Sequence, residues 1–119
     1  MDLRGQTVGV IEGYRYGPDF DNYQAVNRHF SEDLETAVRL FANNRYQLFI
    51  CEEFLGHYIL KEYGMPYYKT MPYIAETRLN YLEIVKTTRN SEEFLKIINA
   101  GLEKLYEEGI IDEIIEKYK

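Results

Sequence analysis

The sequence predicts an α/β fold built on a mostly parallel sheet. Residues 7–11 and 46–51 are two short apolar runs, which favour strands over helices because of their length and their β-branched and aromatic content. Amphipathic helical patterns stand between and after these runs. Strands that alternate with helices are typical of parallel sheets, because parallel neighbours need a long crossover connection.

Size and composition fit one folded domain. The chain has 119 residues, of which 45% are hydrophobic and 29% charged, as in ordinary soluble domains. The net charge of −6 repels polyanions, so we expect no nucleic-acid partner. No apolar run approaches the roughly 18 residues of a membrane span, and residues 1–5 do not resemble a signal peptide. We therefore expect a soluble chain without a targeting segment.

The first strand leads through a turn into a helix. Gly13 follows residues 7–11, and Gly17 with Pro18 suits the start of a helix over residues 19–25. Residues 25–30 fit either the end of this helix or a short strand, and the pattern leaves both open.

A second helix and a second strand follow. Ser31 suits an N-cap before acidic residues, and apolar residues at 34, 37, 38 and 41 share one helical face. This helix is predicted to end at residues 43–44, and residues 46–51 to form a buried strand. Glu52 then begins a helix that Gly64 ends.

The C-terminal part is predicted to hold a loop, a strand and two helices. The loop covers residues 65–77 and the strand residues 79–86. Asn90 and Glu93 resemble a capping box for a helix over residues 91–108, and Gly109 separates it from a short terminal helix. The first of these helices carries an apolar stripe that we expect to face a core: Phe94, Ile97, Ile98, Leu102 and Leu105.

The residue pattern argues against catalysis and against metal or cofactor chemistry. Cys51 is the single cysteine and lies in an apolar run, which predicts an inert core thiol. Neither Cys51 nor the histidines, His29 and His57, show a catalytic spacing. Glu53 and His57 lie four apart but lack a third ligand, so we predict no metal. Residues 13–17 lack the ending of a phosphate-binding loop.

Three blocks of sequence resemble one known family. They are Asp-Leu-Arg-Gly-Gln-Thr-Val-Gly-Val at residues 2–10, residues 44–52, and residues 105–118. Together they are similar to bacterial extracellular solute-binding proteins of family 3, which are type II periplasmic binding proteins. The resemblance implies a three-layer α/β sandwich with helices on both faces of the sheet. It also implies that residues 1–119 form one lobe, with residues 91–119 as closing helices that pack on another lobe in the family. That first lobe normally lies upstream, so we expect a truncated gene product or an expressed fragment.

The resemblance also implies a ligand site. In the family, the turn after the first strand offers amides and side chains to the ligand, and Gly13, Tyr14, Arg15 and Tyr16 occupy that turn. Free amides at a helix start favour a carboxylate, to which Arg15 would add a bidentate contact. Glu52 holds the place of the family's acid that binds the amino group of α-amino acids. The alternative interpretation is a solvent-facing loop, with Glu52 serving the helix dipole as Glu53 would do equally well.

Two functions follow as expectations. The resemblance implies a non-catalytic lobe that binds an amino acid or another small polar solute in the periplasm and serves an ABC-type membrane transporter. The alternative is a truncated lobe that acts as a dimerising interaction or sensor module without solute capture. For the chain under either function we expect a homodimer through the C-terminal helices, because Phe94, Ile98 and Leu102 would otherwise form an exposed patch.

Overall fold

The fold was analysed in a computed structural model, which describes residues 2–65 and 67–118. The chain divides into two units, one ending at Thr77 and the other beginning at Arg78. The first unit holds a small parallel sheet with helices, and the second holds two helices. The predicted mixed α/β class is therefore confirmed. None of the described helices has the length and apolar content that crossing a membrane requires.

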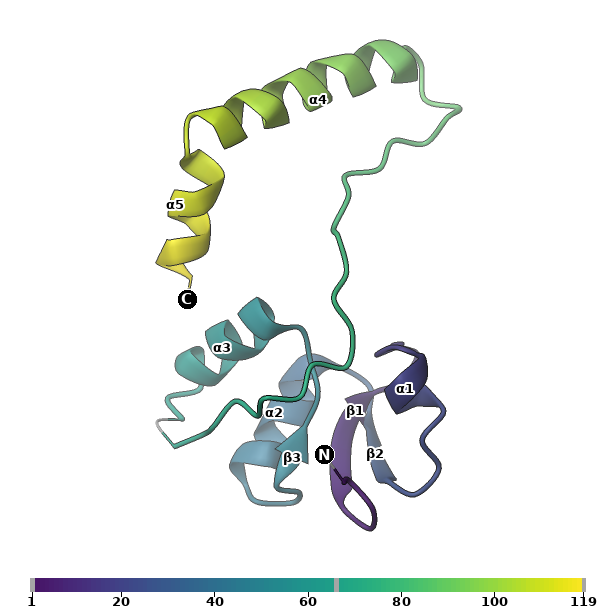
Figure 1. The fold of residues 1–119 in the computed structure, drawn as a ribbon, viewed down its shortest axis with the longest axis vertical. Helices are drawn as coiled ribbons and strands as arrows, with labels where there is room; N and C mark the ends of the chain where they lie inside the picture. The colour runs from purple at the N-terminus through teal and green to yellow at the C-terminus, as the bar shows by residue number, and fades with distance from the viewer. Residues whose placement is uncertain (1, 66, 119) are drawn as a thin grey trace. The chain divides into compact units, whose positions relative to one another are not determined.

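The sheet of the first unit has three parallel strands (Figure 1). They are β1 (Thr7–Ile11), β2 (Asn27–Ser31) and β3 (Leu48–Phe49), in the order β2-β1-β3. Val10 lies beside Phe30 of β2, and Gly9 beside Phe49 of β3. β1 is therefore the central strand, with a neighbour on each side, as the continuous hydrophobicity of residues 7–11 predicts.

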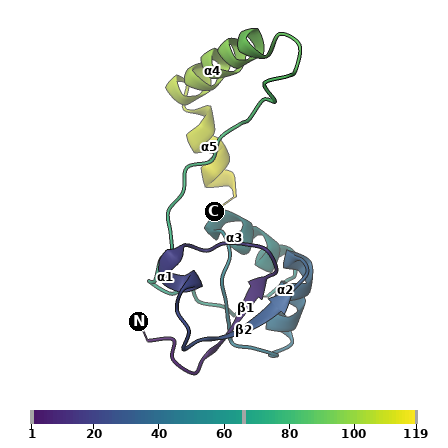
Figure 2. The same ribbon diagram turned by 90° about the vertical axis from the view of Figure 1, so that its right-hand side faces the viewer.

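Helices lie on both faces of this sheet. Figure 2 shows α1 (Pro18–Asp21) and α2 (Leu34–Ala42) on opposite sides of β1 and β2. The third helix of the unit, α3 (Glu53–Glu62), follows β3 and contacts α2. Since α1 is a single turn, it covers its face of the sheet far less completely than α2 covers the other.

Side chains alternate between the two faces of β1. Val8 and Val10 pack with Phe20 of α1 and with Val26 in one buried cluster. On the other face, a Cβ atom at Gly9 would lie 2.2 Å from the ring of Tyr46, so only glycine leaves room for this ring. The buried Tyr46 hydroxyl donates to the carbonyl of Ala37 at 2.6 Å, which ties the entry of β3 to α2.

Several predicted boundaries of the first unit are corrected. The helix expected over residues 19–25 ends at Asp21, and the ambiguous stretch after it holds β2. Asp33, not Ser31, caps α2, because Ser31 is the last residue of β2. The strand expected over residues 46–51 is confined to Leu48 and Phe49, which pair with Val8 and Gly9 of β1.

The second unit consists of α4 (Ser91–Glu107) and α5 (Ile110–Lys117), joined at Gly109 with φ 73°. Both helices and the left-handed glycine between them confirm the prediction. The strand expected over residues 79–86 is wrong. A strand needs a hydrogen-bonded neighbour, and the described elements of this unit are two helices.

One further expectation for α4 is wrong. Asn90 lies in the left-handed region, with φ 59° and ψ 30°, and its side chain makes no capping hydrogen bond. Along the apolar stripe, Phe94 and Ile97 are 50% and 61% exposed, whereas Ile98, Leu102 and Leu105 are half-buried. A helical period fixes the face of a helix but not the presence of a surface to cover it.

Candidate functional site

The turn after β1 and the turn after β3 leave the same edge of the sheet, because all three strands are parallel. From β1 the chain runs to β2 on one side and then crosses to β3 on the other side. The carboxyl ends of β1 and β3 therefore flank the point where the strand order reverses, which is where open α/β sheets bind ligands. Gly13, Tyr14, Arg15 and Tyr16 follow β1, and Glu52 follows β3.

The turn after β1 is held by its own hydrogen bonds. The Tyr14 N–H donates to the carbonyl of Ile11 at 3.2 Å, and the Tyr16 N–H donates to the carboxylate of Asp21 at 3.1 Å. Gly13 and Gly17 have φ of 81° and 107°, a region that side-chain-bearing residues rarely adopt. Within the described chain, the amides of Gly13 and Arg15 have no hydrogen-bond acceptor and remain free for a ligand.

Tyr16 fixes the geometry of this turn. Its phenol oxygen accepts a hydrogen bond from the Ile11 N–H at 2.8 Å, and its ring lies edge-on to the ring of Phe20 at 5.7 Å. Burial raises the pKa of the Tyr16 phenol, although the hydrogen bond from Ile11 opposes this. Tyr16 is thus a neutral, anchored wall of the site.

A hollow of about 330 Å³ lies beside this turn. Of the five predicted site residues, it brings together Tyr14, Arg15 and Tyr16. Its other lining residues come from β1, α1 and β2: Val10, Ile11, Phe20, Asp21, Arg28 and Phe30. Gly13 and Glu52 do not line it.

Arg28 is the residue of the hollow that the sequence reasoning missed. One of its terminal nitrogens donates to the carbonyls of Phe20 and Tyr23, the latter at 3.0 Å, and its guanidinium lies 4.8 Å over the Phe20 ring. Arg28 and Phe30 are two apart on β2 and so share the sheet face of Val10. If residues 25–30 are taken as a strand, this alternation predicts that Arg28 lies on the same face as Val10.

Glu52 serves the helix that follows it. Its carboxylate accepts hydrogen bonds from the N–H groups of Phe54 at 3.1 Å and Leu55 at 2.8 Å, as an N-cap does. This is the arrangement that the alternative interpretation of Glu52 predicts. Glu53 lies exposed in the first turn of the same helix.

Cys51 lies immediately before Glu52 and is a free thiol. Burial raises the pKa of this thiol to about 12, and the negative charge of Glu52 adds to the effect. The thiol therefore stays protonated at neutral pH, which suits a packing role and not a nucleophile.

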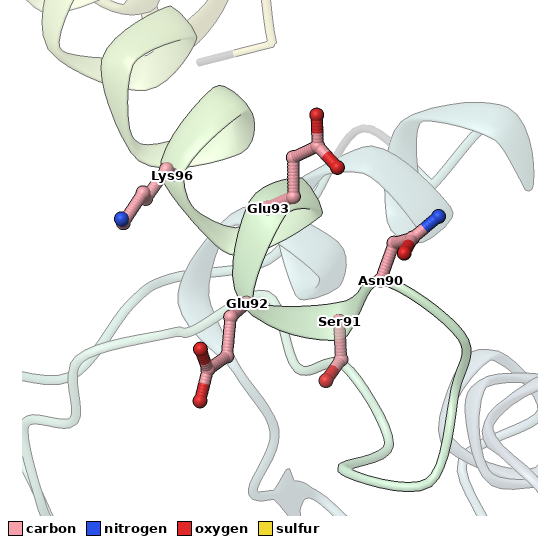
Figure 3. A pocket seen from close by; sticks show the side chains of 5 residues that line it. All are labelled: Asn90, Ser91, Glu92, Glu93 and Lys96. Carbon is pink, nitrogen blue, oxygen red and sulfur yellow. The ribbon is translucent and has the colours of Figure 1, made fainter.

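A second hollow, of about 490 Å³, lies at the start of α4. Figure 3 shows its lining side chains pointing in different directions from a single helical turn: Asn90, Ser91, Glu92, Glu93 and Lys96. They do not converge on a ligand position. The carboxylates of Glu92 and Glu93 also oppose the anion that a helix N-terminus would otherwise attract.

Among residues 2–65 and 67–118, no group of three or more His, Cys, Asp and Glu side chains is arranged to hold a metal ion. His57 instead shares a hydrogen bond with the hydroxyl of Tyr68, 3.0 Å from its Nδ1.

Comparisons of the chain with protein-family models, with curated proteins and with solved structures found no match.

Proposed function

We propose that the chain is a non-catalytic solute-binding lobe of the type II periplasmic-binding-protein kind, with a three-layer α/β sandwich. Its ligand is a small zwitterionic solute of the amino-acid class. The observation that carries this proposal is the hollow at the carboxyl end of β1, which Tyr14, Arg15 and Tyr16 line together. The hollow is lined from β1, α1 and β2, and a concave site at the carboxyl ends of parallel strands is a usual ligand position in such sheets.

In this proposal the turn after β1 recognises the carboxylate. Arg15 supplies a charge-assisted hydrogen bond, and the free amides of Gly13 and Arg15 supply backbone donors. Glu52 receives the amino group with the acceptor capacity that its two capping hydrogen bonds leave. Delivery to an ABC-type transporter and a periplasmic location follow from the family resemblance.

Thermal unfolding with a panel of amino acids tests this function. A ligand that binds only the folded chain raises its stability by about 2.7 kcal/mol at a concentration of one hundred times Kd. We expect a shift with at least one member of the panel, and its loss in Arg15→Ala and Glu52→Gln. The glutamine keeps a capping acceptor for α3 while it removes the charge. Arg45→Ala, an exposed arginine outside the hollow, is the matched control. No shift at millimolar concentration would reject solute capture.

A second candidate is an interaction or sensor module that forms a homodimer through its C-terminal helices. The observation that favours it is the apolar face of α4, where no described residue is buried. Contiguous exposed apolar surface of this kind is typical of association sites. We expect the sedimentation-derived mass to rise with concentration, and Phe94→Glu to prevent the rise. A monomer at every concentration would reject this function.

A further inference from the structure

We infer that the hollow beside β1 selects an organic anion with an apolar, ring-bearing body and does not require an amino group on it. This inference rests on the proposed function, because it concerns the ligand of the same site. It changes the expected ligand of the site from a zwitterionic solute to a ring-bearing carboxylate, and it adds Arg28 as a residue that determines specificity.

The first step is the charge of the hollow. Two cations, Arg15 and Arg28, line it together with a single carboxylate, Asp21. The Asp21 carboxylate already accepts the Tyr16 N–H through both of its oxygens, at 3.1 and 3.2 Å. Neither arginine has an ion-pair partner in the part of the chain that the structure describes. The hollow therefore offers excess positive charge to a ligand.

The second step is the readiness of Arg28 to bind. Its side chain is half-buried, and its recorded hydrogen bonds all come from one terminal nitrogen, which donates to two carbonyl groups. Those bonds fix the guanidinium in place, and its other nitrogens keep their donors. A positioned guanidinium with unused donors is suited to a carboxylate, which it contacts at little entropic cost.

The third step is the aromatic lining. The ring centroids of Tyr14 and Tyr16 are 6.4 Å apart and those of Tyr16 and Phe20 are 5.7 Å apart, and the Arg28 guanidinium lies over the Phe20 ring. Three aromatic rings and a cation therefore line the hollow together. Tyr14 and Phe30 are 63% and 60% exposed although they line the hollow, so both leave apolar surface for a ligand to cover.

The fourth step concerns the amine. Asp21 is the acid that lines the hollow, and it stands against two arginines there. Glu52 lies outside the lining and caps α3. A protonated amine in the hollow would face two positive charges and one negative charge, which is an electrostatic cost. The hollow thus favours an anion that carries no amine.

Three matched probes test the inference by amide NMR titration of the whole chain. They are 3-phenylpropanoate, L-phenylalanine, which adds only the amino group, and 3-phenylpropan-1-ol, which lacks the charge. We expect 3-phenylpropanoate to bind at least as tightly as phenylalanine, and the alcohol to bind about tenfold or more weakly. The amides whose chemical shifts change on binding should belong to residues 13–21 and 28–31. Added salt should weaken the binding of 3-phenylpropanoate.

Variants locate the binding. Arg15→Gln and Arg28→Lys should each weaken 3-phenylpropanoate by about tenfold, because a lysine keeps the charge of Arg28 but not its planar donors. Arg45→Gln removes the same charge outside the hollow and should leave the affinity unchanged. Arg15 makes no side-chain hydrogen bond within the described residues, so its variant keeps the inference testable if Arg28→Lys unfolds.

The outcomes separate the two proposals. Binding of 3-phenylpropanoate without binding of any amino acid supports the inference and rejects the zwitterionic ligand of the proposed function. Binding of amino acids that depends on Glu52, with no binding of 3-phenylpropanoate, overturns the inference and leaves the proposed function standing. Absence of binding by every probe and every amino acid at millimolar concentration rejects both.

Discussion

The two units of this chain differ in what their apolar residues do. The buried hydrophobic side chains of the described residues all lie between Val8 and Leu60, in the first unit. In the second unit, α4 and α5 are also amphipathic, yet no described residue of either helix is buried. Both units therefore have amphipathic helices, and among the described residues the fully buried apolar side chains belong to the first unit.

The difference has a structural cause. In the first unit the sheet gives α2 a surface, and the residues of α2 that face it, Ala37 and Val38, are fully buried. Within the second unit, α4 contacts α5. The Lys104–Glu108 pair spans 3.9 Å and is exposed at both ends, so it adds little stability. Helix propensity and local hydrogen bonds must then maintain α4, and these are weak without tertiary packing.

Matched tyrosine substitutions test this contrast most strongly. Tyr46→Ala removes a buried ring and its hydrogen bond to Ala37, which should lower the free energy of unfolding of the first unit by about 3–5 kcal/mol. Tyr106 lies on the exposed surface of α4, so Tyr106→Ala should change the free energy of unfolding of its own unit by less than about 0.5 kcal/mol. Urea denaturation followed by tyrosine fluorescence gives both values. Equal effects would show that the second unit carries a core of its own.

Replacing glycine by alanine should change stability in opposite directions in the two units. A Cβ atom at Gly9 would overlap the Tyr46 ring, so Gly9→Ala should destabilise the first unit by about 1–3 kcal/mol. A Cβ atom at Gly101 in α4 meets nothing within 4 Å, so Gly101→Ala should raise helix stability by about 0.5–1 kcal/mol. Thermal melts followed by circular dichroism measure both. The cost of Gly9→Ala should shrink in a Tyr46→Ala background, and an unchanged cost would rule out the steric cause.

Much of the fold was predictable because local chemistry determines it. The strand at residues 7–11, the helices after residues 33, 52 and 90, and the left-handed Gly109 follow from the hydrophobic period and the terminating glycines, although the caps expected at Ser31 and Asn90 are wrong. The strand expected over residues 79–86 failed for the opposite reason. Its apolar residues fit a strand, but a strand exists only with a neighbour, and sequence period does not supply one.

The candidate site was predictable only in part. The turn residues Tyr14, Arg15 and Tyr16 line the hollow because they follow the central strand, and strand ends can be read from the sequence. Arg28 escaped prediction because Asn27–Ser31 carries polar residues that hide its strand pattern. The hydrogen bonds that tie Tyr16 to Ile11 and Asp21 depend on the fold of the turn and not on its composition.

Substitutions at the N-caps of α2 and α4 should give the smallest difference in stability between the two units. Asp33 accepts the Thr36 N–H at 2.7 Å, and this hydrogen bond lowers the pKa of the Asp33 carboxyl. The bond therefore stabilises the fold above the unfolded-state pKa, and this contribution is lost as the pH falls through the lowered folded-state value. Asp33→Ala should lower the melting temperature of the first unit at pH 7, and the difference from the unsubstituted chain should narrow on acidification.

At the start of α4, Asn90 caps nothing with its side chain and adopts a left-handed conformation. Asn90→Gly, which relieves that conformation, should leave the helix signal unchanged or slightly higher at every pH. Thermal melts of Asp33→Ala and Asn90→Gly, recorded from pH 7 to acidic pH, measure the difference between the two caps. A loss of helix in Asn90→Gly as large as that in Asp33→Ala would show that Asn90 caps α4 through its side chain after all. The capping interactions of the two units would then be equivalent, and the contrast between them would rest on burial alone.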